Sequence, residues 1–222
     1  MTAALLIDSL IRTVQVGSLY ALMALGLTLT MAVIKLPNFA HAELISVGAF
    51  AALLISMGLS SSPLLVLGSA FLASALTALA CHRVVYRPLA RVNPSMYTMI
   101  LASFAVGLIL RYILFLLVDR FDLFDKRIQM PTTVVVQTDW LTVTNLFVWV
   151  VPTSIALVII LSLILNYTEL GREMRALADN ADLAAITGIP IERVKNLTWV
   201  FAGGLAGVGG AMWGMYTFVN PM

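Results

Sequence analysis

The sequence predicts an all-α fold, a polytopic transmembrane helical bundle. Apolar residues make up 61% of the 222 residues, and the mean hydropathy is +0.99. Charged residues make up only 11%, whereas about 25% is usual in soluble domains. The apolar residues gather in windows of about 20, the length that crosses the hydrocarbon core as a helix. Because a helix satisfies its own backbone hydrogen bonds in lipid, we expect about six spans, or five and a broken or re-entrant helix.

Six apolar windows are the candidate spans: 13–34, 38–59, 63–81, 95–118, 146–165 and 196–218. The first is too long for the apolar core of a signal peptide and lacks a small-residue cleavage site, so we expect a retained span. Pro37 predicts a helix boundary after the first window because it has no amide hydrogen. The second window opens with Asn38, His41 and Glu43, so it either spans fully or begins as a broken helix.

Basic residues are divided unequally between the predicted loops. If loops 82–94 and 166–195 are cytoplasmic, that side carries eight Lys and Arg and the other side carries four. The eight are Lys35, Arg83, Arg87, Arg91, Arg172, Arg175, Arg193 and Lys195, and the four are Arg12, Arg120, Lys126 and Arg127. This asymmetry follows the positive-inside rule. A re-entrant second window only exchanges Lys35 for Arg12, so the charges do not place the N-terminus.

Polar and aromatic residues in or beside the windows give further predictions. Arg111 lies inside window 95–118, and we expect its side chain to extend outward toward Asp119 and Asp122, with a place on a central pathway as the alternative. Tryptophans and tyrosines near window ends, among them Tyr86 and Trp199, are predicted to anchor the helices at the membrane interface. The stretch TTVVVQT at residues 132–138 predicts a short exposed strand.

Three polar residues at the start of the second window form the first candidate site. Asn38, His41 and Glu43 either line a pathway for solute or protons, or brace the turn between two helices, and bracing is favoured. No metal site is predicted, because His41, Glu43 and a distant His82 do not make a coordination shell. Cys81 is the only cysteine, which excludes an intramolecular disulfide. The net charge of +2 gives no indication of nucleic acid binding.

Glycines in the last window predict close helix packing. In AGGLAGVGGAMWG, Gly203 and Gly207, and then Gly210 and Gly214, are four residues apart. This spacing is typical of surfaces at which two membrane helices approach closely. Packing within the chain is favoured, and an interface with a partner subunit is the alternative.

The stretch GREMRALADNADLAAITGIPIERVK, residues 171–195, is polar and predicted to be helical. Its alanines favour helix, whereas Gly188 and Pro190 stop one. We expect one amphipathic helix of about four turns and a second helix after Pro190. The first would present a polar face of Arg172, Arg175, Asp179 and Asp182, and a shallow apolar face of Leu177, Ala181, Ala184 and Ala185. A solvated connector between two spans is the alternative function.

This stretch closely resembles the EAA-type coupling loop of ABC-importer permeases, in the form of the LivH-type branched-chain amino acid permease family. The matching positions are Gly171, Arg172, Arg175, Ala176, Asn180, Ala184, Ala185, Gly188, Ile189 and Lys195. The likeness extends to YALMALGLTLT at 20–30, NFAHAELISVGAF at 38–50, VYRPL at 85–89, FAGGLAGVGGAMWGMY at 201–216, and NP at 220–221. Pro37 and Ala42 depart from the family pattern. Family members continue for two or three further helices, so we expect the sequence to be C-terminally incomplete.

The resemblance implies a single transmembrane permease domain over residues 1–222, with a cytoplasmic coupling loop over 166–195. It implies a non-enzymatic subunit of an ABC importer for branched-chain (aliphatic) amino acids, without a cofactor, in a bacterial or archaeal plasma (inner) membrane. The implied partners are two cytoplasmic ATPase subunits, a sister permease subunit, an extracytoplasmic solute-binding protein and the lipid bilayer. The implied ATPase-coupling residues are Arg172, Arg175, Ala176, Asn180, Ala184, Ala185 and Gly188.

The absence of certain motifs separates this function from its rivals. No G-x-x-x-x-G-K-[ST] phosphate-binding loop is present, so a partner must supply ATP hydrolysis. Neither G-x-S-x-G nor H-E-x-x-H occurs, which argues against an intramembrane hydrolase. An ABC permease for urea or short amides, and an ATP-independent channel or secondary transporter, remain the alternatives.

Overall fold

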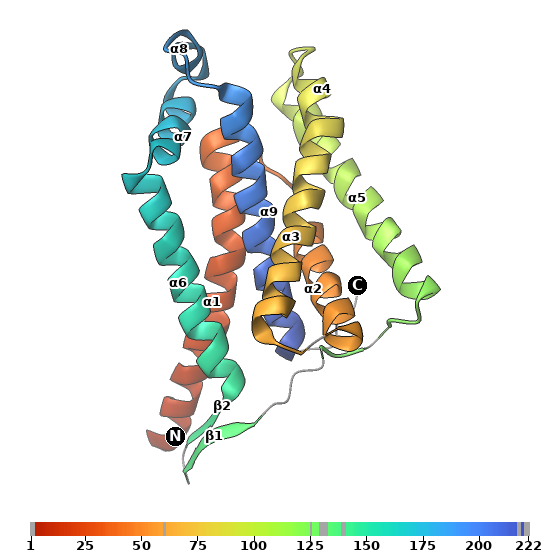
Figure 1. Cartoon of the computed structure of the whole chain (residues 1–222), viewed down its shortest axis with the longest axis vertical. Coiled ribbons are helices and arrows are strands. Elements are labelled where there is room, and N and C mark those ends of the chain that lie inside the picture. Colours follow the sequence, from red (N-terminus) through yellow and green to blue (C-terminus); the bar gives the residue numbers. More distant parts are fainter. Residues whose placement is uncertain are drawn as a thin grey trace.

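The structure is a computed structural model that describes residues 3–59, 61–124, 126–128, 133–138, 141–216 and 219. In chain order its elements are α1 (Ala3–Ile34), α2 (His41–Gly58), α3 (Pro63–Cys81), the π-helix η1 (His82–Tyr86), α4 (Arg87–Ala90), α5 (Met96–Arg120), the strands β1 (Val134–Thr138) and β2 (Leu141–Thr144), α6 (Asn145–Tyr167), α7 (Glu169–Asp179), α8 (Ala181–Ile186) and α9 (Ile191–Tyr216). Long helices dominate (Figure 1), which confirms the predicted all-α class.

Within the described residues, five helical segments are long and apolar enough to cross a membrane: Leu6–Ile34, His41–Gly58, Pro63–Ala90, Met96–Arg120 and Asn145–Tyr167. The protein is therefore a multi-pass helical membrane protein. Helix α9 has 26 residues but is rich in glycine. It packs against α1, α2 and α3 and is mostly buried by them. Because protein covers α9, it does not need the hydropathy of a helix that faces lipid.

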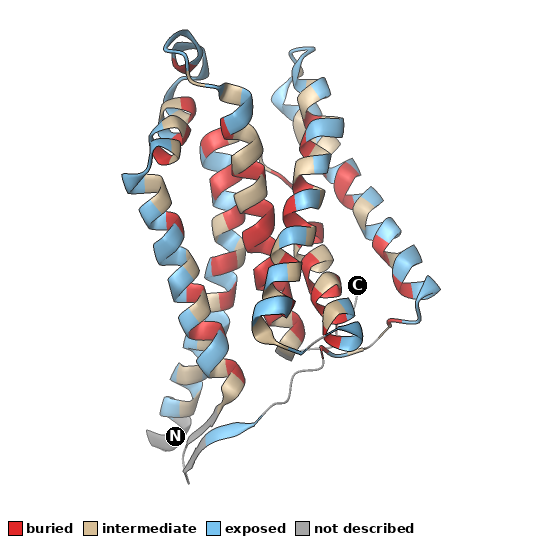
Figure 2. Cartoon of the chain, in the orientation of Figure 1, coloured by how far each residue is buried: buried red, intermediate tan, exposed pale blue. Residues whose placement is uncertain are grey.

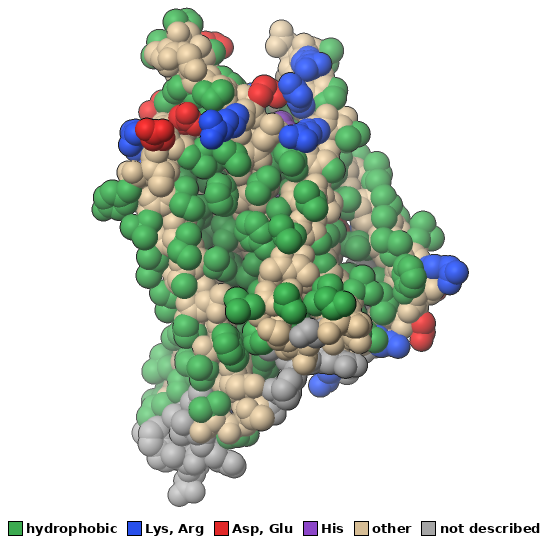
Figure 3. All heavy atoms as spheres, in the orientation of Figure 1, with side chains coloured by type: hydrophobic (Ala, Val, Ile, Leu, Met, Phe, Trp, Pro, Cys, Tyr) green, Lys and Arg blue, Asp and Glu red, His purple; other side chains and the backbone are tan. Residues whose placement is uncertain are grey.

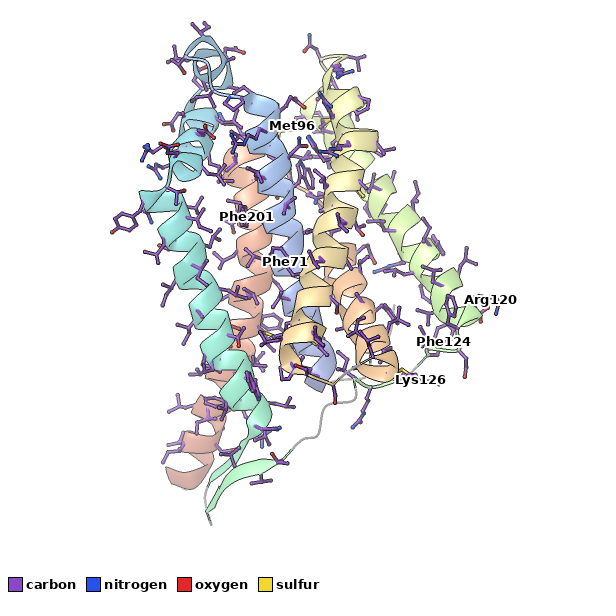
Figure 4. All side chains as sticks on the ribbon, viewed as in Figure 1. Phe71, Met96, Arg120, Phe124, Lys126 and Phe201 are labelled. Atoms are coloured by element: carbon purple, nitrogen blue, oxygen red, sulfur yellow. The ribbon has the colours of Figure 1, made fainter. Side chains whose placement is uncertain are left out.

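The long helices alternate in direction and sort their connections to two ends of the bundle. Helices α4, α7 and α8 lie at one end, here called the hairpin end, whereas the start of α1 and both strands lie at the other (Figure 1). Met96 lies near the hairpin end, and Arg120 and Lys126 lie at the opposite end (Figure 4). Charged side chains gather at both ends, with an apolar band between them (Figure 3). The start of α1 is therefore opposite the hairpin, a point that the charge count left open.

Glycines allow α9 to lie close to the backbones of its neighbours. A Cβ added at Gly203 would lie 2.8 Å from the Ser74 carbonyl oxygen, and one at Gly207 would lie 3.0 Å from the Ala70 carbonyl carbon. A Cβ added at Gly210 would meet Ile45, and one added at Gly214 would meet Ile128 and Val219. All four thus make contacts within this chain, and the buried residues of α9 lie in the middle of the bundle (Figure 2).

Residues 82–94, predicted as a loop, are largely helical. The chain continues from α3 through η1 and α4 to Ala90, and only residues 91–95 form a connection. The Arg87 amide donates to the His82 carbonyl five residues earlier, directly before Pro88, which has no amide to donate. The prediction ended this helix at residue 81, where the apolar window stops and charged residues begin. Arginine favours helix, however, so the helical chain continues beyond the apolar window.

The strand predicted over residues 132–138 is confirmed as β1, whose bounds are Val134–Thr138. It pairs antiparallel with β2, with Gln137 opposite Thr142. Val134 and Val135 are 52% and 55% exposed. The two-stranded sheet of β1 and β2 therefore lies on the surface, at the end of the bundle opposite α7 and α8 (Figure 1).

Candidate functional site

The first candidate site is a break between α1 and α2, at residues 35–40. Lys35 has a φ of 58° and Pro37 follows it, so the chain leaves α1 and remains non-helical until His41 begins α2. This confirms the boundary predicted from Pro37, and the second window is helical from His41 onward, as the candidate span His41–Gly58. Asn38, His41 and Glu43 are 2%, 5% and 7% exposed, so all three polar side chains lie in the protein interior. We call these three residues the break site.

Asn38 joins the break to the region between α3 and α5. Its Oδ1 accepts hydrogen bonds from the Tyr86 hydroxyl at 3.1 Å and from the Ala40 amide at 3.2 Å. The Tyr86 ring stacks on Trp199 of α9, with ring centroids 4.9 Å apart, and His82 stacks on Trp199 at 5.6 Å. Tyr86 and Trp199 are 2% and 1% exposed. The prediction that they anchor the membrane interface is therefore wrong, because tertiary packing buries both rings.

Helix α5 covers one side of the break. The Phe39 amide donates to Ser103 Oγ at 3.2 Å, and the Ser103 hydroxyl lies 3.3 Å from the Pro37 carbonyl. One turn further, a Cβ added at Gly107 would lie 3.4 Å from Cα of Ala40. A lone serine inside an apolar span was the available sequence signal for Ser103, and it was missed.

His41 and Glu43 each bind a different helix. His41 Nε2 lies 3.0 Å from the Met23 carbonyl of α1. Glu43 Oε1 lies 3.0 Å from Arg111 Nη2 of α5. The predicted outward extension of Arg111 toward Asp119 and Asp122 is therefore wrong. Glu43 is buried, and Arg111 turns inward to pair with it, because an unpaired carboxylate at this depth is far less stable.

A pocket of about 390 Å³ opens beside the break site. Its wall is mainly apolar and comes from α1 and the start of α2: Tyr20, Met23, Ala24, Leu27, Phe39, Ala42 and Ile45, with Asn38 and His41. Phe39 and Tyr20 are 58% and 57% exposed. The arrangement places polar groups of a helix start next to an apolar space, which suits a small amphiphilic solute.

The second candidate site is the polar segment 171–195 at the hairpin end. The prediction of a single helix of about four turns is wrong, because the segment forms two helices, α7 and α8. Asn180 has an extended backbone, with φ −152° and ψ 108°, and separates α7 from α8. Its Oδ1 accepts from the amides of Asp182 and Leu183, both at 3.0 Å. Asparagine is among the best N-cap residues, so it begins a new helix where the alanine content predicted continuity.

Helix α7 is attached to the bundle through one apolar face. Met174 and Leu177 are 1% and 2% exposed and lie in a core with residues of α1, α6 and α9. Burial of each contributes about 2 kcal/mol. Of the predicted apolar face, Leu177 is therefore buried against the bundle, and Ala184 is also buried, at 3% exposed.

The remaining predicted coupling residues are divided between internal contacts and the surface. Arg172 pairs with Glu169 at 3.6 Å, and the Arg175 guanidinium donates to the Leu165 carbonyl at the end of α6. Ala176 is half-buried and Ala185 is exposed. Gly188 has a φ of +84° and ends α8, with the Ile189 amide donating to the Ala184 carbonyl at 3.1 Å. This confirms the predicted stop at Gly188.

Two apolar side chains at the tip were missed. Leu183 and Ile186 of α8 are 59% and 83% exposed. They lie three residues apart in a short helix outside the candidate spans, so both project from the hairpin end. The sequence signal was present in DLAAI, but the prediction of one long helix assigned the apolar face to Leu177 and three alanines instead. The predicted second helix after Pro190 is confirmed as α9, and Glu192 in its first turn pairs with Arg87 at 2.6 Å.

The fold is that of a multi-pass helical membrane protein, with a buried polar break between α1 and α2 and a helical hairpin at one end. The sequence profile of the family described as branched-chain amino acid transport system / permease component matches residues 9–222, and the chain belongs to this family. Membership confirms the resemblance seen in the sequence and establishes a transport role as an ABC permease.

Curated relatives lie in both bacteria and an archaeon. The chain is 28% identical to the high-affinity branched-chain amino acid transport system permease protein LivH of Salmonella typhimurium, over 97% of this chain and 73% of that protein. It is 28% identical, with the same coverage, to the corresponding protein BraD of Pseudomonas aeruginosa. A probable LivH of Methanocaldococcus jannaschii is also 28% identical, over 88% of this chain and 62% of the relative. No solved structure matches the chain.

Proposed function

We propose that this chain is a permease subunit of an ABC importer for branched-chain, aliphatic amino acids. It forms half of the translocation pathway with a sister permease and receives the work of ATP hydrolysis from two cytoplasmic ATPase subunits. An extracytoplasmic binding protein delivers the solute. Family membership and the printed names of the relatives support the solute class.

The observation that carries the coupling role is the exposed apolar pair on α8. Leu183 and Ile186 lie beyond the candidate spans and are exposed in the isolated chain. Helices that dock into the groove of a partner typically present apolar anchors at this spacing. Leu183 and Ile186 are the groups that an ATPase groove would bury, while Met174 and Leu177 fasten the neighbouring α7 to the bundle.

Charge supports a cytoplasmic position for the hairpin end. The eight basic residues assigned to the cytoplasmic loops include Arg83, Arg87 and Arg91 around α4, and Arg172 and Arg175 on α7. Under the positive-inside rule the hairpin end faces the cytoplasm of a bacterial or archaeal cell, and the start of α1 faces the opposite side of the plasma membrane. This orientation brings α8 to the side where ATP is available.

The break site and its pocket are the part of this chain that we place on the translocation pathway. Arg111, which pairs with Glu43 of the break site, is 44% exposed at the side chain although it lies inside a candidate span. A guanidinium exposed to hydrocarbon would be costly, so water or another subunit must face it. Alternating access then arises from relative movement of the two permeases when the ATPases close.

The test uses the complete transporter reconstituted in vesicles with its binding protein. Ile186→Asp places a charge in the apolar contact and should reduce ATP-dependent leucine uptake at least about tenfold. Val92→Asp is the matched control, because Val92 is 73% exposed at the same end of the bundle and lies in no helix. Uptake by the unaltered protein without ATP, or normal uptake by Ile186→Asp, would rule out this coupling.

A further inference from the structure

Two buried polar atoms of the break site have no partner within the described part of the chain: Nδ2 of Asn38 and Nδ1 of His41. Each of the two side chains has its other polar atom occupied, Asn38 Oδ1 by Tyr86 and Ala40, and His41 Nε2 by the Met23 carbonyl. Both residues are more than nine-tenths buried and both line the 390 Å³ pocket. Buried polar groups are normally paired, so these two atoms at one pocket are available to hydrogen bond a ligand.

The two atoms have opposite hydrogen-bonding character. The amide nitrogen of Asn38 can only donate. The Met23 carbonyl can only accept, so His41 Nε2 carries the proton in that hydrogen bond and Nδ1 is left as an acceptor. The site therefore offers one donor and one acceptor on two residues that line the same pocket, which matches the carboxylate and ammonium groups of an α-amino acid.

The start of α2 adds a positive potential on the donor side. Its first-turn amides at His41, Glu43 and Leu44 donate to the carbonyls of Asn38 and Ala40, whereas the amide of Ala42 has no acceptor among the described residues. Helix N-termini attract anions through such free amides and the helix dipole. Glu43 in this turn does not cancel the potential, because Arg111 neutralises its carboxylate.

We propose that the break site binds a zwitterionic α-amino acid during transport. The carboxylate accepts from Asn38 Nδ2 and the Ala42 amide, the ammonium donates to His41 Nδ1, and the aliphatic side chain occupies the space beside Ala24, Leu27 and Ile45. The two side-chain atoms are covered in this conformation, and the carboxylate and ammonium reach them when the pathway opens. This inference rests on the proposed transport function and selects an α-amino acid over urea or a short amide, which lack the carboxylate.

The decisive variant is Asn38→Asp. It keeps an oxygen for Tyr86 and Ala40, so the bracing of the break persists, but it removes the donor and adds a charge that repels a carboxylate. In the reconstituted transporter, the amount of radiolabelled leucine taken up per ATP hydrolysed should fall by about tenfold or more, because both the lost hydrogen bond and the like charge weaken binding. Uptake per ATP within about twofold of the unaltered protein overturns the proposal.

A second pair of variants tests the proposal even if Asn38→Asp disrupts the fold around residues 35–40. Ala24→Phe fills the pocket from the exposed surface of α1 and should also lower leucine uptake per ATP. Ala21→Phe is the control, because Ala21 is exposed on the same helix and does not line the pocket. If Ala24→Phe transports as well as Ala21→Phe, the amino acid site is excluded even where Asn38→Asp is inactive. Failure of the unaltered transporter to accumulate leucine with ATP would instead refute the proposed function.

Discussion

Arg111 of α5 holds Glu43 of α2 by two contacts to one oxygen, from Nε and from Nη2, each at 3.0 Å. Helix α5 lies at the edge of the bundle (Figure 1), and this pair fastens it to the first turn of α2. Glu43 is nearly buried whereas Arg111 is 44% exposed at its side chain. The buried carboxylate therefore needs its partner more than the half-exposed guanidinium does. Loss of Arg111 should destabilise the protein more than loss of Glu43.

Arg111→Gln should destabilise the protein by about 3 kcal/mol, because it leaves a buried carboxylate without its cation. The double variant Glu43→Gln/Arg111→Gln should be more stable than Arg111→Gln alone, since two neutral amides can hydrogen bond in the same space. Thermal unfolding in detergent measures both effects. Equal stability of the single and double variants would contradict a role for this ion pair.

Tyr86→Phe should lower the free energy of unfolding by about 1 kcal/mol, because Asn38 Oδ1 loses one of its two hydrogen-bond donors. The aromatic stack on Trp199 is retained. Denaturant unfolding of the purified protein measures the loss. Tyr112→Phe provides the comparison, because Tyr112 is 64% exposed and its change should be nearly neutral. A Tyr86→Phe protein as stable as that control would mean that the hydroxyl does not stabilise the break.

Gly207→Ala should be strongly destabilising, because an added methyl group would meet the Ala70 carbonyl oxygen and lie 3.0 Å from the Ala70 carbonyl carbon. Backbone cannot move aside as a flexible side chain can, so the helices must separate. Gly68→Ala in α3 should instead be neutral or stabilising by about 0.5 kcal/mol, since nothing lies within 4 Å of the added atom. Melting temperatures of the two variants compare them directly, and the reverse order would show that α9 is not packed as described.

Asn180→Ala should lower the stability of the hairpin by about 1 kcal/mol, because the amides of Asp182 and Leu183 lose their acceptor. Asn180→Asp keeps that acceptor and should behave like the unaltered protein. Hydrogen exchange of the α8 amides in the intact protein reports the local effect. Unchanged exchange in Asn180→Ala would mean that the side chain does not cap the helix.

Much of the fold follows from local patterns. Long apolar windows predicted the membrane helices, Pro37 predicted the break, and Gly188 with Pro190 predicted where α8 ends and α9 begins. These signals are local, because each acts on the backbone conformation at its own position. Backbone groups in lipid must be hydrogen bonded, proline has no amide to donate, and a positive φ favours glycine, whatever the neighbouring helices are. The TTVVVQT run predicted β1 for a similar reason, since β-branched residues favour an extended chain.

Partners across the bundle were much harder to predict. Arg111 was expected to reach outward, and only the fold shows that Glu43, 68 residues away in sequence, lies beside it. Trp199 and Tyr86 have the sequence position of interfacial anchors, yet stacking between α9 and η1 buries them. Leu183 and Ile186 project outward because Asn180 starts a new helix and thereby changes which face of the segment is exposed.

The amino-acid sequence by itself determined the membrane class, the helix boundaries at proline and glycine, and membership of a permease family, because each depends on composition or on neighbouring residues. Only the tertiary structure decided which end holds the start of α1, which polar groups at the break are paired, and which two atoms of Asn38 and His41 have no partner among the described residues. These features depend on where distant helices approach one another, and helix periodicity does not encode the partner that a buried polar atom will meet.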